Sequence, residues 1–230
     1  GCAASKWLSV VLNSHPDIFC VHDQRFFWHQ FAGSRDISDI EYLKIVGMQG
    51  HGHLLAGDVH GIARFSIEQL KNEFGDAFRC AVVVRHPLER AFSAVRLWNE
   101  FEPDAVDLTY LAQEEYSPLQ QFLTTREAKL FAHALILSTA IKDELRVGPV
   151  FRCEDLTTNP EAIWKLISHI SNGTIQLESG MSTAMHRQEK INQHRPRIDT
   201  RVEDWHLELL TSILDKESRQ AYVELGYKLE

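Results

Sequence analysis

The sequence has no apolar run near the roughly 20 residues that a helix needs to cross a bilayer, and no signal peptide is visible in it. Gly1 already stands within a candidate motif, so a segment that precedes it would not be seen. We therefore expect no transmembrane segment in this chain. A cytoplasmic location is favoured, and the Golgi lumen is the alternative if an upstream segment exists.

Positive charge is also in short supply. The 24 lysines and arginines are outnumbered by 32 acidic residues, which gives a formal net charge of -8. Nucleic acids bind through clustered cations on the protein surface, so this balance argues against a nucleic-acid partner. An anionic ligand must instead be held by a local basic pocket.

Cysteine is scarce, with four residues in the chain. Cys20, Cys80 and Cys153 lie in apolar runs typical of strands, which favours buried small side chains over a disulfide framework or a metal site. Histidine, aspartate and glutamate are scattered without the spacing of metal ligands. We therefore predict no metal.

What is present is a regular alternation of strand and helix patterns. Apolar runs typical of strands occupy residues 18–21, 54–59, 80–84 and 150–153. Helical patterns or helix-start signals lie before Pro16, from Ser66, from Pro87, over 126–145, from Pro160 and around 205–214. This alternation predicts an α/β fold, with one domain over residues 1–230 and a central parallel sheet flanked by helices on both faces.

Three of these helix starts carry specific signals. Ser66 and Gln69 have the spacing of a capping box. Asn159-Pro160 combines a favoured N-cap residue with a favoured first helical residue, and Pro87 suits the first position of the helix after the third strand.

The opening stretch is the most distinctive part of the chain. Small residues precede Ser5 and Lys6, and a strongly apolar helix follows. The N–H groups at the start of such a helix lack intrahelical partners and lie at the positive end of its dipole, so they suit a phosphate or sulfate group. The alternative is an ordinary turn before a buried helix, because the G-x-x-x-x-G-K-[ST] spacing of an NTP-binding loop is absent.

Three stretches, in order along the chain, resemble the sulfotransferases that use 3′-phosphoadenosine 5′-phosphosulfate (PAPS). Residues 5–18 are similar to the family's 5′-phosphosulfate loop and helix, commonly S-G-T-T-W-L ending in H-P. Residues 83–93 resemble its 3′-phosphate motif, R-D-P-x-x-R-A-x-S, and residues 152–161 resemble its R-Y-E-D-L…N-P-E segment. The resemblance spans nearly the whole chain and implies the P-loop NTPase-like fold of this family.

The resemblance also implies a donor site. The 5′-phosphosulfate would lie on the backbone amides of the opening loop, from Ala3, Ala4, Ser5, Lys6 and Trp7. The 3′-phosphate would bind Arg85 and Ser93, since a guanidinium suits the geometry of a phosphate. The alternatives are a salt-bridging arginine at a strand end and an exposed helix serine.

A late basic loop of the family closes over the 3′-phosphate and adenine. The matching stretch here runs from Arg187 to Arg201, and it offers Lys190, Asn192 and Arg195 as contacts. The alternative interpretation is a solvated run of surface charge.

The opening loop departs from the family pattern. The usual basic residue aligns with Cys2, the S-G pair aligns with Ala3-Ala4, and Lys6 falls on a threonine position. We therefore expect Lys6 to neutralise the leaving phosphate.

Two residues compete for the role of catalytic base. Asp23 aligns with the catalytic glutamate of the tyrosylprotein sulfotransferases, and His60 stands where enzymes acting on small hydroxyl compounds carry a catalytic histidine. A histidine titrates near neutral pH, whereas an aspartate needs a desolvated site. Asp23 is placed slightly ahead, with His22 as a further candidate. The structural alternatives are a turn-capping carboxylate and a polar residue that closes a strand.

The expected function is transfer of a sulfuryl group from PAPS to a hydroxyl acceptor, with PAP as the product. The acceptor would be a sugar, a small alcohol or phenol, or a peptidyl tyrosine. One alternative is a sulfotransferase-like binding protein that has lost catalysis. The other is a P-loop kinase, which the missing G-K-[ST] and the lack of an evident acidic strand end for Mg²⁺ disfavour.

Overall fold

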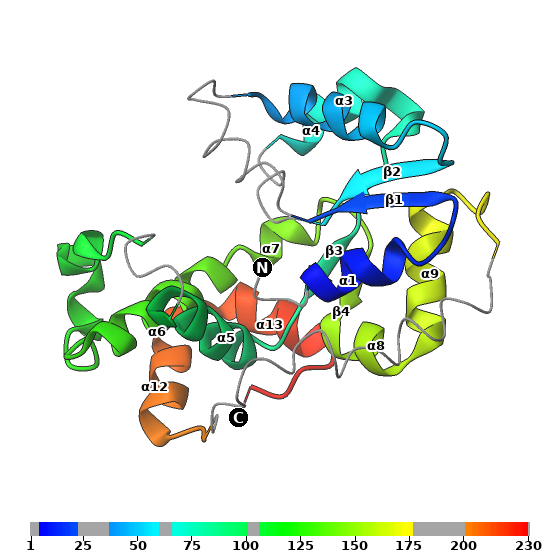
Figure 1. The fold of residues 1–230 in the computed structure, drawn as a ribbon. Coiled ribbons are helices and arrows are strands. Elements are labelled where there is room, and N and C mark those ends of the chain that lie inside the picture. Colours follow the sequence, from blue (N-terminus) through cyan, green and yellow to red (C-terminus); the bar gives the residue numbers. More distant parts are fainter. Residues whose placement is uncertain (1–4, 23–36, 60–65, 101–105, 177–200, 230) are drawn as a thin grey trace. The chain divides into compact units, whose positions relative to one another are not determined.

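The computed structural model describes residues 5–22, 37–59, 66–100, 106–176 and 201–229 (Figure 1). The chain divides into two compact units. The first is built from residues within Ala3–Val83 and Val147–Pro196, and the second from residues within Val84–Arg146 and Arg197–Glu230. That residues 1–230 form a single domain stays a prediction.

The strands of the described residues form two small sheets. β1 (Ile18–Val21) pairs in parallel with β2 (Leu55–Asp58), in a register that runs from Ile18↔Leu55 to Val21↔Asp58. β3 (Val82–Val84) pairs with β4 (Val150–Arg152). The chain is thus a mixed α/β protein, but the expected central sheet is not confirmed, because these four strands pair two by two.

The first unit is organised around α1 (Ser5–Leu12), which lies beside β1 (Figure 1). Its apolar side chains enter a core shared with β1, α8 (Cys153–Thr158) and α9 (Pro160–Ile170). The buried members of this core are Trp7, Leu8, Val11, Leu12, Ile18, Cys20, Leu156, Ile163, Leu166, Ile167 and Ile175. Each large side chain removed from water contributes about 1.5–3 kcal/mol, so this core fixes α1 on the sheet.

Two further helices belong to the first unit, α3 (Asp39–Gln49) against β2 and α4 (Ile67–Phe74). The capping box predicted at Ser66 is wrong: its side chain makes no cap bond, and its ψ of 7° is far from the extended conformation of an N-cap residue. A capping box is present instead at Ser38 and Glu41. The predicted Asn159-Pro160 cap is confirmed, since Asn159 Oδ1 accepts the N–H of Glu161 at 2.9 Å.

The described part of the second unit is helical. It contains α5 (Pro87–Glu100), η3 (Thr109–Ala112), η4 (Glu114–Leu119), α6 (Arg126–Ser138), α7 (Ile141–Glu144), α12 (Asp204–Ile213) and α13 (Lys216–Glu224). Its central packing is α5 on α6, with α12 against both. Pro87 begins α5 as predicted.

The helix expected over 126–145 is interrupted between α6 and α7. Ser138 Oγ donates to the carbonyl of Ala134, and Thr139 Oγ1 donates to that of Ile136. Hydroxyls that bond backbone carbonyls in this way compete with helix continuation, which accounts for the break.

Among the helices in the described ranges, none has the length and apolar character that crossing a bilayer requires.

Gly148 marks a close backbone approach in the first unit. A Cβ atom at this position would lie 2.5 Å from the carbonyl oxygen of Cys80, a distance that no side chain tolerates. We expect Gly148→Ala to lower the free energy of unfolding by about 1–3 kcal/mol, because the backbone must shift to admit a methyl group. Urea denaturation of the purified variant measures this loss.

The matched control is Gly47→Ala on α3, where a Cβ would meet nothing within 4 Å. Alanine is the better helix former, so this variant should gain up to about 1 kcal/mol. Equal stability of the two variants would contradict the close approach at Gly148.

Candidate functional site

The candidate site begins at the first residue of α1. Ser5 is 8% exposed, and its Oγ lies 2.8 Å from Nε2 of His22, the residue after β1. Lys6, next in the chain, is exposed. The hydroxyl of Ser5 is therefore held at the carboxyl end of β1, while the side chain of Lys6 is accessible.

The predicted role of Trp7 concerns its backbone amide, whereas its side chain lies in the core of the first unit. The indole is 2% exposed within the core of the first unit, and its buried N–H has no hydrogen-bond partner in the described structure. The backbone amides of Ser5, Lys6 and Trp7 belong to the first turn of α1, where no intrahelical acceptor exists. Ala3 and Ala4, the other predicted amide donors, lie outside the described residues.

Two polar residues hold the far end of α1, and sequence reasoning gave them no role. Asn13 Oδ1 accepts the N–H of Cys20 at 2.7 Å, and its Nδ2 donates to the carbonyl of Cys20. Buried His15 accepts the N–H of Asp17 through Nδ1 at 3.1 Å, so its Nε2 carries the proton and donates to the carbonyl of Gln176 at 2.9 Å. Their position between a helix end and a buried strand was the available signal.

The two candidate bases follow strands that are neighbours. Val21 and Asp58 are paired at the ends of β1 and β2, and the N–H of Val59 donates to the carbonyl of Val21 at 3.0 Å. Asp23 and His60 come two residues after these paired ends in the sequence. Both lie outside the described residues, so the choice between them is not tested.

Two side chains of these strands, Asp58 and Cys20, have surroundings that limit their chemistry. The hydroxyl of Tyr42 donates to Oδ2 of Asp58 at 3.0 Å. Burial, and to a lesser extent the charge of Asp58, raises the pKa of the Cys20 thiol to about 12. Cys20 therefore stays protonated at neutral pH and is not a nucleophile.

The predicted binding position for the 3′-phosphate is the corner where β3 leads into α5. Arg85 is half-buried, and its Nη2 lies 3.1 Å from Oε2 of Glu89, one helical turn along. The ion pair that was the structural alternative for Arg85 is thus present. Ser93 is half-buried on α5, eight residues after Arg85. That Ser93 and Arg85 converge on one phosphate stays a prediction.

The remaining predicted contacts are Lys190, Asn192 and Arg195, and they lie outside the described residues. Within the ranges that the structure describes, no group of three or more histidine, cysteine, aspartate or glutamate side chains is arranged to hold a metal ion.

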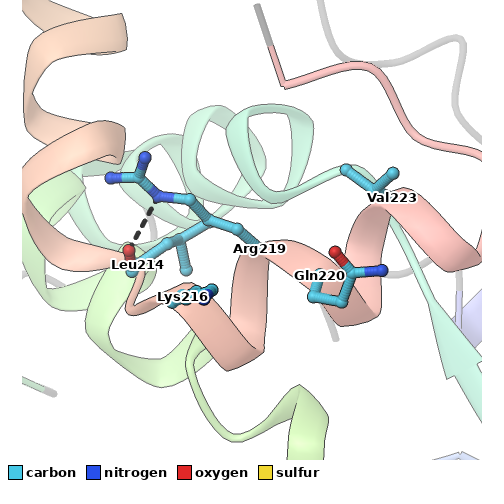
Figure 2. Close-up of a pocket in the computed structure, with 5 residues that line it drawn as sticks. All are labelled: Leu214, Lys216, Arg219, Gln220 and Val223. Carbon is cyan, nitrogen blue, oxygen red and sulfur yellow. Dashed lines mark hydrogen bonds between the residues drawn. The ribbon is translucent and has the colours of Figure 1, made fainter.

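Two surface hollows in the described structure lie elsewhere. The larger, about 410 Å³, is lined by Leu214, Lys216, Arg219, Gln220 and Val223 at the turn between α12 and α13 (Figure 2). Arg219 Nε donates to the carbonyl of Leu214 at 2.9 Å, and its Nη2 bonds that of Thr211. This guanidinium therefore caps the carboxyl end of α12, and the hollow is not taken as a ligand site. The other hollow, about 310 Å³, borders α9 and includes none of the predicted site residues.

Models of known protein families, curated proteins and solved structures were compared with this chain, and none matches it. The resemblance to sulfotransferases therefore depends on the three sequence stretches.

The tie between Asn13 and Cys20 should be measurable as stability. Asn13→Ala removes both hydrogen bonds to the Cys20 backbone, and we expect a loss of about 1–3 kcal/mol in the free energy of unfolding. Ser14→Ala is the matched control, because Ser14 Oγ bonds only the carbonyl of Val11, three residues back in its own turn. If both variants lose the same stability in chemical denaturation, the Asn13 side chain does not anchor α1.

Proposed function

We propose that the protein transfers a sulfuryl group from PAPS to a hydroxyl acceptor. The observation that supports this best is the 2.8 Å contact between Ser5 and His22. It joins the first residue of α1 to the carboxyl end of β1, where ligands bind in open α/β sheets. In the sequence, both candidate bases follow this edge by two residues.

The start of α1 holds the 5′-phosphosulfate. Its first-turn amides donate to the anion at the positive end of the helix dipole. Ser5 adds a hydroxyl whose position is set by His22. Lys6 is exposed and brings the positive charge that neutralises the leaving phosphate. The buried indole of Trp7 supports this turn from the core side.

The corner at Arg85 holds the 3′-phosphate, together with Ser93. Glu89 pairs with the Arg85 guanidinium, with Oε2 3.1 Å from Nη2. A phosphate carries more charge and accepts two parallel N–H bonds from arginine, so it displaces a half-exposed carboxylate. Glu89 therefore competes with the nucleotide and weakens its binding.

The chemistry is an in-line displacement. The acceptor oxygen forms a bond to sulfur as the bond from sulfur to the 5′-phosphate oxygen breaks, and PAP leaves. A base takes the proton of the acceptor hydroxyl, and the cation and amides at α1 stabilise the charge that develops on the leaving phosphate. Asp23 is the first candidate for the base and His60 the second.

Calorimetry with PAP tests the donor site. Wild-type protein should bind PAP equally well with EDTA and with Mg²⁺, since the site uses cationic side chains and amides. Arg85→Ala should weaken binding roughly 10- to 100-fold, because it removes charge-assisted hydrogen bonds to the phosphate. Glu89→Gln is the matched control: it should tighten binding by about threefold, since it removes the competing charge of a surface pair.

Transfer of labelled sulfate from PAPS to a panel of phenols, sugars and tyrosyl peptides completes this test. PAP binding without transfer to any acceptor would favour a binding protein. No PAP binding at all, or binding of ATP that requires Mg²⁺, would overturn the proposal.

Single-turnover rates with saturating PAPS identify the groups that act in the chemical step. Replacing the base should slow transfer by about 10²- to 10⁴-fold, so either Asp23→Asn or His60→Ala should fall in that range and the other should stay fast. Lys6→Ala should also be slow, because the leaving phosphate loses its cation. A wild-type rate for Lys6→Ala would remove it from the mechanism.

A further inference from the structure

The segment that follows α13 turns back sharply. Gly226 has a φ of 82°, in the left-handed region that favours glycine. The N–H of Gly226 donates to the carbonyl of Val223 at 2.8 Å, and that of Tyr227 donates to the carbonyl of Tyr222 at 3.0 Å. This pair of bonds is a Schellman motif, which ends α13 and directs Tyr227 back along the helix.

The redirected segment is tied to the corner that carries Arg85. Tyr227 is 5% exposed, and its hydroxyl donates to the carbonyl of Val84 at 2.9 Å. One residue on, the carbonyl of Lys228 accepts a bond from Nε2 of His86 at 2.7 Å. The rings of His86 and Tyr227 meet edge to face, with centroids 5.6 Å apart. The residues on both sides of Arg85 are thus held by residues 227 and 228.

His86 also acts on the helix that follows. Its Nδ1 accepts the N–H of Leu88 at 3.3 Å, as an N-cap side chain does for the second residue of a helix. Because Nδ1 is an acceptor, the ring proton is on Nε2, which is the atom that donates to Lys228. The same imidazole therefore caps α5 and bonds the segment that follows α13.

We propose that Tyr227 and His86 are positioning residues for Arg85. They fix the backbone on both sides of this residue, and so they direct its guanidinium toward the 3′-phosphate of the nucleotide. This inference rests on the proposed function, because it takes Arg85 as a phosphate ligand. The gain is pre-organisation: a guanidinium on an anchored backbone loses less freedom when it binds.

The test separates affinity from stability. Tyr227→Phe removes one hydroxyl and keeps the ring. Tyr222→Phe is the matched control: it removes a second buried hydroxyl from the same region, bonded to the carbonyl of Ser138 at 3.2 Å. Both variants should be less stable in denaturation. Only Tyr227→Phe should weaken PAP binding, on the order of fivefold, as expected for one lost hydrogen bond.

A second variant tests the other contact. His86→Asn retains a side chain that can cap α5 but loses the bond to Lys228, so it should weaken PAP binding like Tyr227→Phe. Hydrogen exchange provides a readout without ligand. The amide of Leu88, which donates to Nδ1 of His86, should exchange faster in Tyr227→Phe than in Tyr222→Phe.

The outcomes distinguish this inference from the function on which it rests. If wild-type protein binds PAP and Tyr227→Phe binds it as tightly as Tyr222→Phe, the positioning role is wrong and the donor site stands. If wild-type protein does not bind PAP, the proposed function fails and the phosphate-directing role fails with it. Equal exchange at Leu88 in the two variants would show that Tyr227 does not order this corner.

Discussion

The burial of α1 is the constraint on which the first unit depends. Its apolar side chains pack against β1 and α9, and Asn13 and His15 fix its far end through backbone bonds. A helix anchored along its length cannot tilt without opening this core. Ser5 is therefore held at a defined place beside His22, and the first-turn amides have a fixed direction.

In the second unit, the backbone around Arg85 is fixed by contacts from a distant part of the chain. Arg85 follows β3, a strand of three residues that is too short to fix the direction of the following backbone by itself. Hydrogen bonds to Tyr227 and Lys228 anchor the residues on both sides of Arg85. The guanidinium of Arg85 pairs with Glu89 at 3.1 Å. The corner thus combines a backbone that is hydrogen-bonded on both sides of Arg85 with an ion pair to a half-exposed carboxylate.

Sequence patterns predicted the local elements well where burial is strong and continuous. The strand at 18–21 has the predicted bounds, and α5 and α9 begin at the predicted prolines. The helix α13 was not predicted, because most of its residues are polar and leave only a weak apolar pattern. The break after Ser138 was also missed, since it depends on hydroxyls that bond the backbone.

The sequence by itself determined where apolar segments, caps and candidate anion ligands lie along the chain, because these depend on neighbouring residues. The tertiary structure alone decided which strands pair and what each polar side chain contacts. It placed Ser5 beside His22, Glu89 beside Arg85, and the hydroxyl of Tyr227 against the carbonyl of Val84. Partners such as Tyr227 and Val84, 143 residues apart, leave no periodic signal, because only the folded chain brings them together.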